Sequence, residues 1–121
     1  MAKILYVDDE PDIREVAQMS LELDPNLEVR VCSSGREAIC LAVEWQPDLI
    51  LLDVMMPEMD GPATLRALRE TAAAQVPVLF ITARSQAAEV EALLKTGAVG
   101  VIAKPFDPMV LAESVKAHLR Q

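Results

Sequence analysis

Residues 49–53 read Leu-Ile-Leu-Leu-Asp, an uninterrupted apolar run that ends in a carboxylate. Such a run is typical of a central strand of a parallel sheet, which is buried on both faces. Three other apolar runs lead into polar residues in the same way: 4–7 into Asp8 and Asp9, 78–81 into Thr82, and 99–103 into Lys104. If these runs are parallel strands of one sheet, their carboxyl ends lie along one edge, where open α/β sheets place their sites.

The segments between these runs have apolar residues at helical spacing. We predict helices over 11–22, from Ser34-Gly35 to before Pro47, from Gly61 through Ala72, over 86–96, and from Asp107-Pro108 to about Leu119, with an edge-type strand at 27–32. Asp9 or Glu10 is the expected cap of the first helix, and Ser85 that of the fourth. Inward-facing positions include Val16, Val43, Leu94 and Val110. Repeated strand–helix alternation implies right-handed crossovers and an α/β sheet covered on both sides, although it leaves the strand order open.

Length and composition limit the class of protein. The 121 residues fit a single domain spanning 1–121, and the 52% hydrophobic content supports a core built mainly from aliphatic side chains. The formal net charge of −8 argues against direct binding to nucleic acid or to an anionic membrane. Cys32 and Cys40 match no zinc motif, and no apolar run is long enough to span a membrane or to resemble a signal peptide. We therefore expect a cytoplasmic protein.

The carboxylates at the predicted sheet edge indicate a cation site. Asp8 and Asp9 follow the first strand, and Asp53 ends a fully apolar strand without a local partner. Three neighbouring carboxylates repel one another and raise each other's pKa unless a cation lies among them. Mg²⁺ suits such a set because it takes one or two carboxylates and completes its shell with water and phosphate oxygens.

The remaining residues at this edge suit phosphoryl chemistry. Lys104 carries a charge that pairs with carboxylate or phosphate, Thr82 has a hydroxyl that can donate to a phosphoryl oxygen, and the small Ala83 leaves room above the site. Lys104-Pro105 is a candidate cis peptide. Together these residues predict an aspartyl-phosphate site in which Asp53 is the nucleophile, Asp8 and Asp9 hold Mg²⁺, and Lys104 and Thr82 contact the phosphoryl group.

This arrangement resembles the receiver domain of two-component response regulators, including chemotaxis regulators. The resemblance rests on Asp8-Asp9, on Asp53 followed by Met56-Pro57 and Asp60-Gly61, on Thr82-Ala83, and on Lys104-Pro105-Phe106, and it spans the whole chain. It implies a flavodoxin-like fold with five parallel strands in the order 2-1-3-4-5 and five helices.

The resemblance also implies a mechanism and partners. The phosphoryl donor would be a sensor histidine kinase or a histidine phosphotransfer protein, and phosphorylation would change affinity for a downstream effector. The Mg²⁺ ligands would be Asp9, Asp53 and the backbone carbonyl of Met55, with Asp8 acting through water. A homodimer through helix 4, strand 5 and helix 5 is a further expectation. Val101 stands where the family often has an aromatic residue, so the usual ring rotation cannot operate here as such.

Other functions remain as alternatives. A haloacid-dehalogenase-like phosphatase or phosphotransferase acting on a small molecule also uses a nucleophilic Asp, but it places a second Asp two residues later, where this chain has Met55. A flavin-binding carrier would need a phosphate-binding loop after the first strand, where this chain has acidic residues. A receiver-like module that binds partners independently of phosphate is the third alternative.

Overall fold

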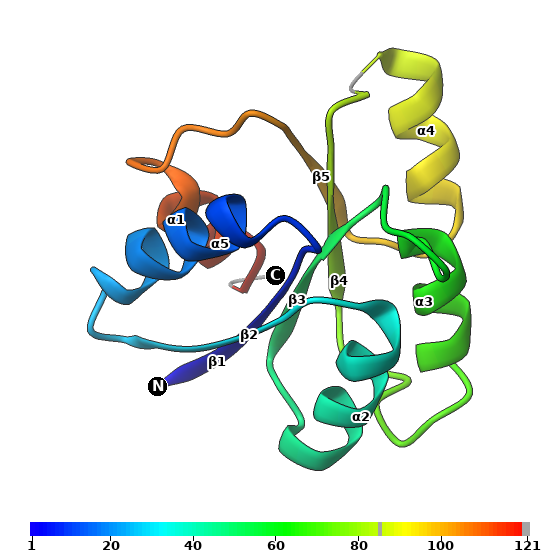
Figure 1. The fold of residues 1–121 in the computed structure, drawn as a ribbon, viewed down its shortest axis with the longest axis horizontal. Helices are drawn as coiled ribbons and strands as arrows, with labels where there is room; N and C mark the ends of the chain where they lie inside the picture. Colours follow the sequence, from blue (N-terminus) through cyan, green and yellow to red (C-terminus); the bar gives the residue numbers. More distant parts are fainter. Residues whose placement is uncertain (85, 120–121) are drawn as a thin grey trace.

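Strands and helices alternate along the chain, as the apolar pattern predicts. The structure is a computed structural model, and it describes residues 1–84 and 86–119. Its elements are β1 (Ala2–Val7), α1 (Pro11–Glu22), β2 (Leu27–Cys32), α2 (Gly35–Trp45), β3 (Leu49–Asp53), α3 (Gly61–Leu68), β4 (Val78–Thr82), α4 (Ala87–Lys95), β5 (Gly100–Ala103) and α5 (Leu111–Leu119). Figure 1 shows the strands in the middle of the molecule with helices on both sides.

The strands form one five-stranded sheet in the order β2-β1-β3-β4-β5, with every neighbouring pair parallel. The flavodoxin-like order 2-1-3-4-5 is therefore confirmed. In this register Val7 lies beside Leu52, Asp53 beside Ile81, and Thr82 beside Ala103. The carboxyl ends of β1, β3, β4 and β5 consequently meet at one edge, which brings the polar residues that follow them together.

Each face of the sheet carries its own apolar cluster. Alternate residues of a strand point to opposite faces, so Leu5 and Val7 of β1 join one cluster while Ile4 and Tyr6 join the other. The first cluster packs under α2 and α3, and the second packs under α1 and α5 (Figure 1). The central strands β3 and β4 are buried throughout, which explains their continuous apolar sequence.

Two helix starts agree with the sequence and one predicted cap does not. Ser34 accepts a hydrogen bond from the Glu37 amide at the start of α2, and Asp60 accepts one from the Ala63 amide at the start of α3. The prediction that Asp9 or Glu10 caps α1 was wrong, because Glu10 occupies the cap position without a side-chain cap bond. The predicted Ser85 cap lies outside the described residues.

Two predicted helix bounds were also wrong. Helix α3 ends at Leu68 instead of continuing through Ala72, and Arg69 Nη1 then donates to the carbonyls of Ala74 and Val76 at 2.8 and 2.9 Å. Helix α5 begins at Leu111 rather than at Asp107. The Asp107 carboxylate accepts a hydrogen bond from the Met109 amide at 2.9 Å, and this turn precedes the helix. In both places a hydrogen bond between a side chain and the nearby backbone stabilises a non-helical conformation, so the helix is shorter than predicted.

Some positions predicted to face inward are exposed. Val16, Val43, Leu94 and Val110 keep 44%, 40%, 42% and 49% of their surface exposed. The helices contact the sheet through narrower stripes than the apolar pattern suggests, and in α1 the buried positions are Ala17, Ser20 and Leu21. Among the residues that the structure describes, no helix is both long enough and apolar enough to cross a membrane.

Gly61 places α3 directly against the end of β3, and this close approach yields a test. A Cβ added at Gly61 would lie 2.7 Å from the Asp53 carbonyl oxygen and 2.9 Å from the Val54 Cα. We expect Gly61→Ala to lower the free energy of unfolding by about 1–3 kcal/mol, as overpacking does. Urea denaturation followed by circular dichroism measures this loss.

A second glycine, Gly97, serves as a comparison that distinguishes the effect of steric crowding from that of backbone strain. Gly97 has a φ of +106° and open space where a Cβ would lie, so Gly97→Ala is strained for a conformational reason alone. We expect both variants to lose stability, but only Gly61→Ala to change the chemical shifts of residues around Asp53. Wild-type stability in Gly61→Ala would contradict the close packing at this edge.

Candidate functional site

The parallel sheet places the predicted site residues at one edge and removes most of them from solvent. Asp8 directly follows β1, Asp53 ends β3, and Thr82 ends β4. These three residues are 0%, 3% and 2% exposed, respectively. Lys104 directly follows β5, and its side chain is 11% exposed. Buried ionised groups at such positions require partners. The expected convergence of charged residues is therefore what the structure shows.

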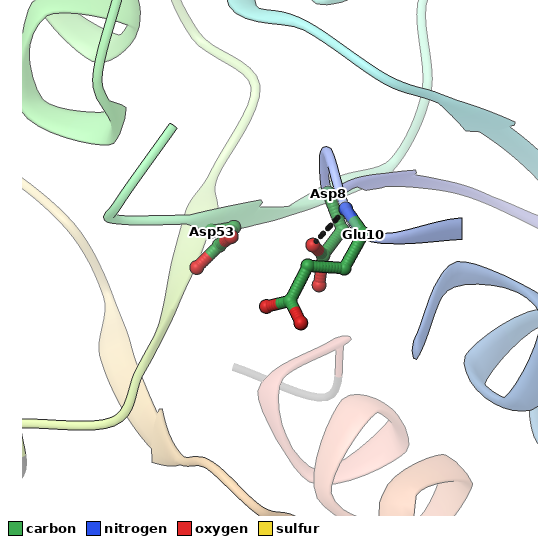
Figure 2. A group of neighbouring side chains, drawn as sticks. All are labelled: Asp8, Glu10 and Asp53. Carbon is green, nitrogen blue, oxygen red and sulfur yellow. Dashed lines mark hydrogen bonds between the residues drawn. The ribbon is translucent and has the colours of Figure 1, made fainter. Parts of the chain in front are cut away.

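Lys104 is the centre of the cluster. Its Nζ lies 3.1 Å from Asp8 Oδ2, 3.1 Å from Glu10 Oε1 and 3.5 Å from Asp53 Oδ2. Figure 2 shows that Asp8 and Glu10 come from the segment after β1 and approach Asp53, which comes from β3. One oxygen from each of these three carboxylates lies within 4.8 Å of the others. One ammonium group is thus shared by three carboxylates from two segments of the chain.

Asp8 is held at both carboxylate oxygens. Oδ1 accepts a hydrogen bond from the Glu10 amide at 2.9 Å (Figure 2), and Oδ2 accepts one from the Tyr6 hydroxyl at 3.1 Å in addition to its contact with Lys104. Tyr6 is fully buried on β1. Sequence reasoning missed the contacts of Tyr6 and Glu10. The position of Tyr6 two residues before Asp8 was the available signal, because residues i and i+2 of a strand share a face.

The other predicted site residues surround this centre without joining it. Asp9 does not belong to the group of three carboxylates, and its Oδ1 is buried with no hydrogen-bond partner among the described residues. Thr82 Oγ1 accepts a hydrogen bond from the Arg84 amide at 3.0 Å. Met55 and Ala83 are exposed on loops that follow β3 and β4. The Lys104–Pro105 peptide is cis, as the sequence suggested.

The environment changes the acidity of the charged groups. Burial is the main cause that raises the pKa of Asp53 to about 7, and the negative charge of Asp8 acts in the same direction, whereas Lys104 opposes both. Burial alone would lower the pKa of Lys104. Its hydrogen bonds with Glu10 and Asp8 outweigh that effect and raise this pKa above its usual value. The lysine therefore stays charged at neutral pH, whereas Asp53 is close to its midpoint of ionisation.

The residues at this edge fit a magnesium ion. Their donor groups are carboxylates, which are the oxygen ligands that Mg²⁺ prefers. Among the described residues, the three carboxylates share a single ammonium, so the cluster keeps an excess of negative charge when they are ionised. The buried Asp9 Oδ1 lacks a partner among the described residues, which a metal–oxygen bond would provide. A site of this kind is suited to phosphoryl transfer, which depends on charge neutralisation and positioning.

Comparison with known proteins agrees with the fold and the arrangement of the site. The sequence profile of the response regulator receiver domain matches residues 4–116, which is most of the chain. The transcriptional regulatory protein SrrA of Staphylococcus aureus is 40% identical over 119 residues, covering 98% of this chain and 48% of SrrA. The DNA-binding response regulator MtrA of Mycolicibacterium smegmatis is 36% identical over 119 residues, covering 98% of this chain and 51% of MtrA. The chain spans about half the length of these curated relatives.

Solved structures show the same fold at nearly full coverage. The chemotaxis protein CheY4 of Vibrio cholerae superposes with a TM-score of 0.88 at 33% identity, covering 97% of this chain and 98% of CheY4. The receiver domain of the Francisella response regulator 1452 gives a TM-score of 0.90 at 28% identity, covering 99% of this chain and 98% of that one. This chain belongs to the family of response regulator receiver domains, whose standard function is signalling by phosphorylation.

The raised pKa of Asp53 makes folding stability depend on pH. A carboxyl whose pKa is higher in the folded state destabilises that state when it is ionised. The resulting loss of folding free energy is complete above a pH of about 7 and becomes smaller as the pH falls toward the ordinary pKa of Asp. In EDTA, we expect Asp53→Asn to raise the melting temperature more at about pH 8 than at about pH 5. Scanning calorimetry at both pH values measures the difference.

Asp12 provides the matched control for this prediction. It is an exposed carboxylate in the first turn of α1, so Asp12→Asn removes the same charge from a hydrated position. We expect no comparable pH-dependent gain in this variant. A gain in Asp53→Asn that is equal at both pH values, or a loss of stability, would contradict the perturbed acidity of Asp53.

Proposed function

We propose that residues 1–121 act as one receiver domain of a two-component system, in which Asp53 accepts a phosphoryl group from a phosphohistidine. The observation that carries the proposal is the position of Asp53, which is 3% exposed and has Oδ2 at 3.5 Å from Lys104 Nζ. A carboxylate next to a cation at the carboxyl edge of the sheet supports the role of Asp53 as the nucleophile. The donor would be a sensor histidine kinase or a histidine phosphotransfer protein.

In the transfer step, an Asp53 carboxylate oxygen forms a bond to phosphorus while the bond from phosphorus to the donor's imidazole nitrogen breaks. The electron pair of that bond stays on the imidazole. Lys104 and the Thr82 hydroxyl would then contact the phosphoryl oxygens, and the small Ala83 beside Thr82 leaves room for the group. Asp9, Asp53 and the Met55 carbonyl would hold Mg²⁺, with Asp8 acting through water. When bound, Mg²⁺ neutralises negative charge on the phosphoryl group and on the carboxylates.

The proposed activity is confined to the protein's own side chain. Water later attacks phosphorus, which breaks the bond to the Asp53 oxygen and returns the carboxylate together with inorganic phosphate. The alternative of a small-molecule phosphatase is disfavoured because Met55 stands two residues after Asp53, where such enzymes place a second Asp. The signalling role of the family supports the receiver function. We therefore propose no enzymatic activity beyond phosphorylation and dephosphorylation of Asp53.

A groove beside the site supports approach of the donor from the α1 side. It has a volume of about 310 Å³ and is lined by apolar residues that include Ile13, Val16 and Phe106. Glu10 and Lys104 belong both to this groove and to the charged cluster. A phosphohistidine protein seated here would therefore have its reactive nitrogen close to the edge that carries Asp53.

The output is proposed to be a change in affinity for an effector protein or domain. The net charge of −8 argues against direct contact of these residues with nucleic acid or a membrane, and the free thiols of Cys32 and Cys40 fit a cytoplasmic protein. Val101 of β5 and Leu93 of α4 both pack against the apolar cluster beneath α2 and α3. Because this position has no aromatic ring to rotate, we propose that small shifts of aliphatic side chains carry the signal to α4.

The proposed phosphorylation is tested with a small donor that bypasses the protein partner. Incubation with acetyl phosphate and Mg²⁺ should add one phosphoryl group to the intact mass of the wild type. Asp53→Ala should gain none, because the nucleophile is missing, and EDTA should suppress the gain in the wild type. Asp12→Ala is the control, since it removes an exposed carboxylate outside the site. Equal phosphorylation of Asp53→Ala and the wild type would reject Asp53 as the acceptor.

The face formed by α4, β5 and α5 is the proposed homodimer surface. Leu94 and Val99 on this side are 42% and 43% exposed, and α4 has no buried residue. We expect acetyl phosphate and Mg²⁺ to shift the protein from monomer toward dimer in sedimentation velocity, and Leu94→Glu to prevent the shift. Met19→Glu is the control, because Met19 is an exposed apolar residue of α1. A monomer in both phosphorylation states would contradict this surface.

A further inference from the structure

We propose that Tyr6 is a positioning residue of the phosphorylation site, whose hydroxyl holds the Asp8 carboxylate toward the metal-binding edge. The inference rests on the proposed function above and assigns a role to a residue that the transfer step does not touch. Tyr6 lies on β1, two residues before Asp8, and its hydroxyl donates to Asp8 Oδ2 at 3.1 Å. Both residues are 0% exposed.

The burial of Tyr6 shows that its hydroxyl requires a partner. Its ring packs in the apolar cluster beneath α1 and α5, where phenylalanine would supply the same apolar surface. A buried hydroxyl without an acceptor destabilises a protein by about 1–3 kcal/mol, so this position is unfavourable for tyrosine unless the hydroxyl is bonded. The acceptor that the fold provides is a carboxylate of the site. The Tyr6 hydroxyl therefore joins a ring in the apolar cluster to a carboxylate of the site.

Tyr6 differs in an important respect from Lys104, which contacts the same Asp8 oxygen, Oδ2. Lys104 contacts Asp8 but is shared with Glu10 and Asp53, and in the proposed reaction it turns toward a phosphoryl oxygen. The hydroxyl of Tyr6 has no such second task. It is also neutral, so it orients Asp8 without cancelling the negative charge that attracts a cation.

The test compares Tyr6→Phe with the wild type for binding of Mg²⁺ alone, by isothermal titration calorimetry. The variant keeps the ring and removes only the hydroxyl. Partners that orient metal ligands typically change metal affinity by 10–100-fold, so we expect a dissociation constant weaker by roughly tenfold. In acetyl phosphate labelling, the Mg²⁺ concentration that gives half-maximal phosphorylation should rise by a similar factor, whereas the level reached at saturating Mg²⁺ should match the wild type.

Ser20→Ala is the matched control. Ser20 is also buried, and its hydroxyl donates to the Pro108 carbonyl, so the variant loses one buried hydrogen bond away from the carboxylates. A purely structural role of Tyr6 would lower the melting temperature without moving the Mg²⁺ midpoint. Unchanged Mg²⁺ affinity in Tyr6→Phe, or an equal loss in both variants, would overturn the positioning role alone. A wild type that binds no Mg²⁺ would overturn the proposed function as well.

Discussion

The ion pairs of Lys104 with Asp8 and Asp53 are the interaction on which the site depends. A parallel sheet with carboxylates at the ends of β1 and β3 buries two negative charges side by side, and neither is tolerated in the interior without a partner. Lys104 reaches both from the end of β5, at 3.1 and 3.5 Å. A single ammonium thus ties three segments of the chain together at one edge of the sheet.

Lys104 neutralises the negative charge at this edge only in part. Glu10 shares the same ammonium, so three carboxylates compete for one positive charge. The excess negative charge favours a divalent cation, and the raised pKa of Asp53 shows how unfavourable its ionisation is without further compensation. A phosphoryl group on Asp53 would redistribute these contacts because it offers Lys104 new oxygens. The same charge arrangement therefore supports both the proposed cation binding and the proposed response to phosphorylation.

Much of the fold and the centre of the site follow from short-range sequence signals. Fully apolar strands that end in Asp53 and Thr82 indicate a buried parallel sheet, and its geometry brings Lys104 to the carboxylates. The order of the strands came only from family resemblance, because each crossover helix allows several neighbours. Side-chain contacts such as that of Glu10 with Lys104 depend on rotamers that no periodicity encodes. The ends of α3 and α5 were misplaced because local hydrogen bonds competed with helix propensity.

The central claim is that Asp53, rather than another carboxylate of the cluster, carries the phosphoryl group. The most direct measurement is reduction of the phosphorylated wild type with borohydride, which converts an acyl phosphate of aspartate into homoserine, followed by peptide sequencing in a mass spectrometer. The account predicts homoserine at position 53 alone. Homoserine at position 8 or 9, or the corresponding reduced side chain at Glu10, would contradict it.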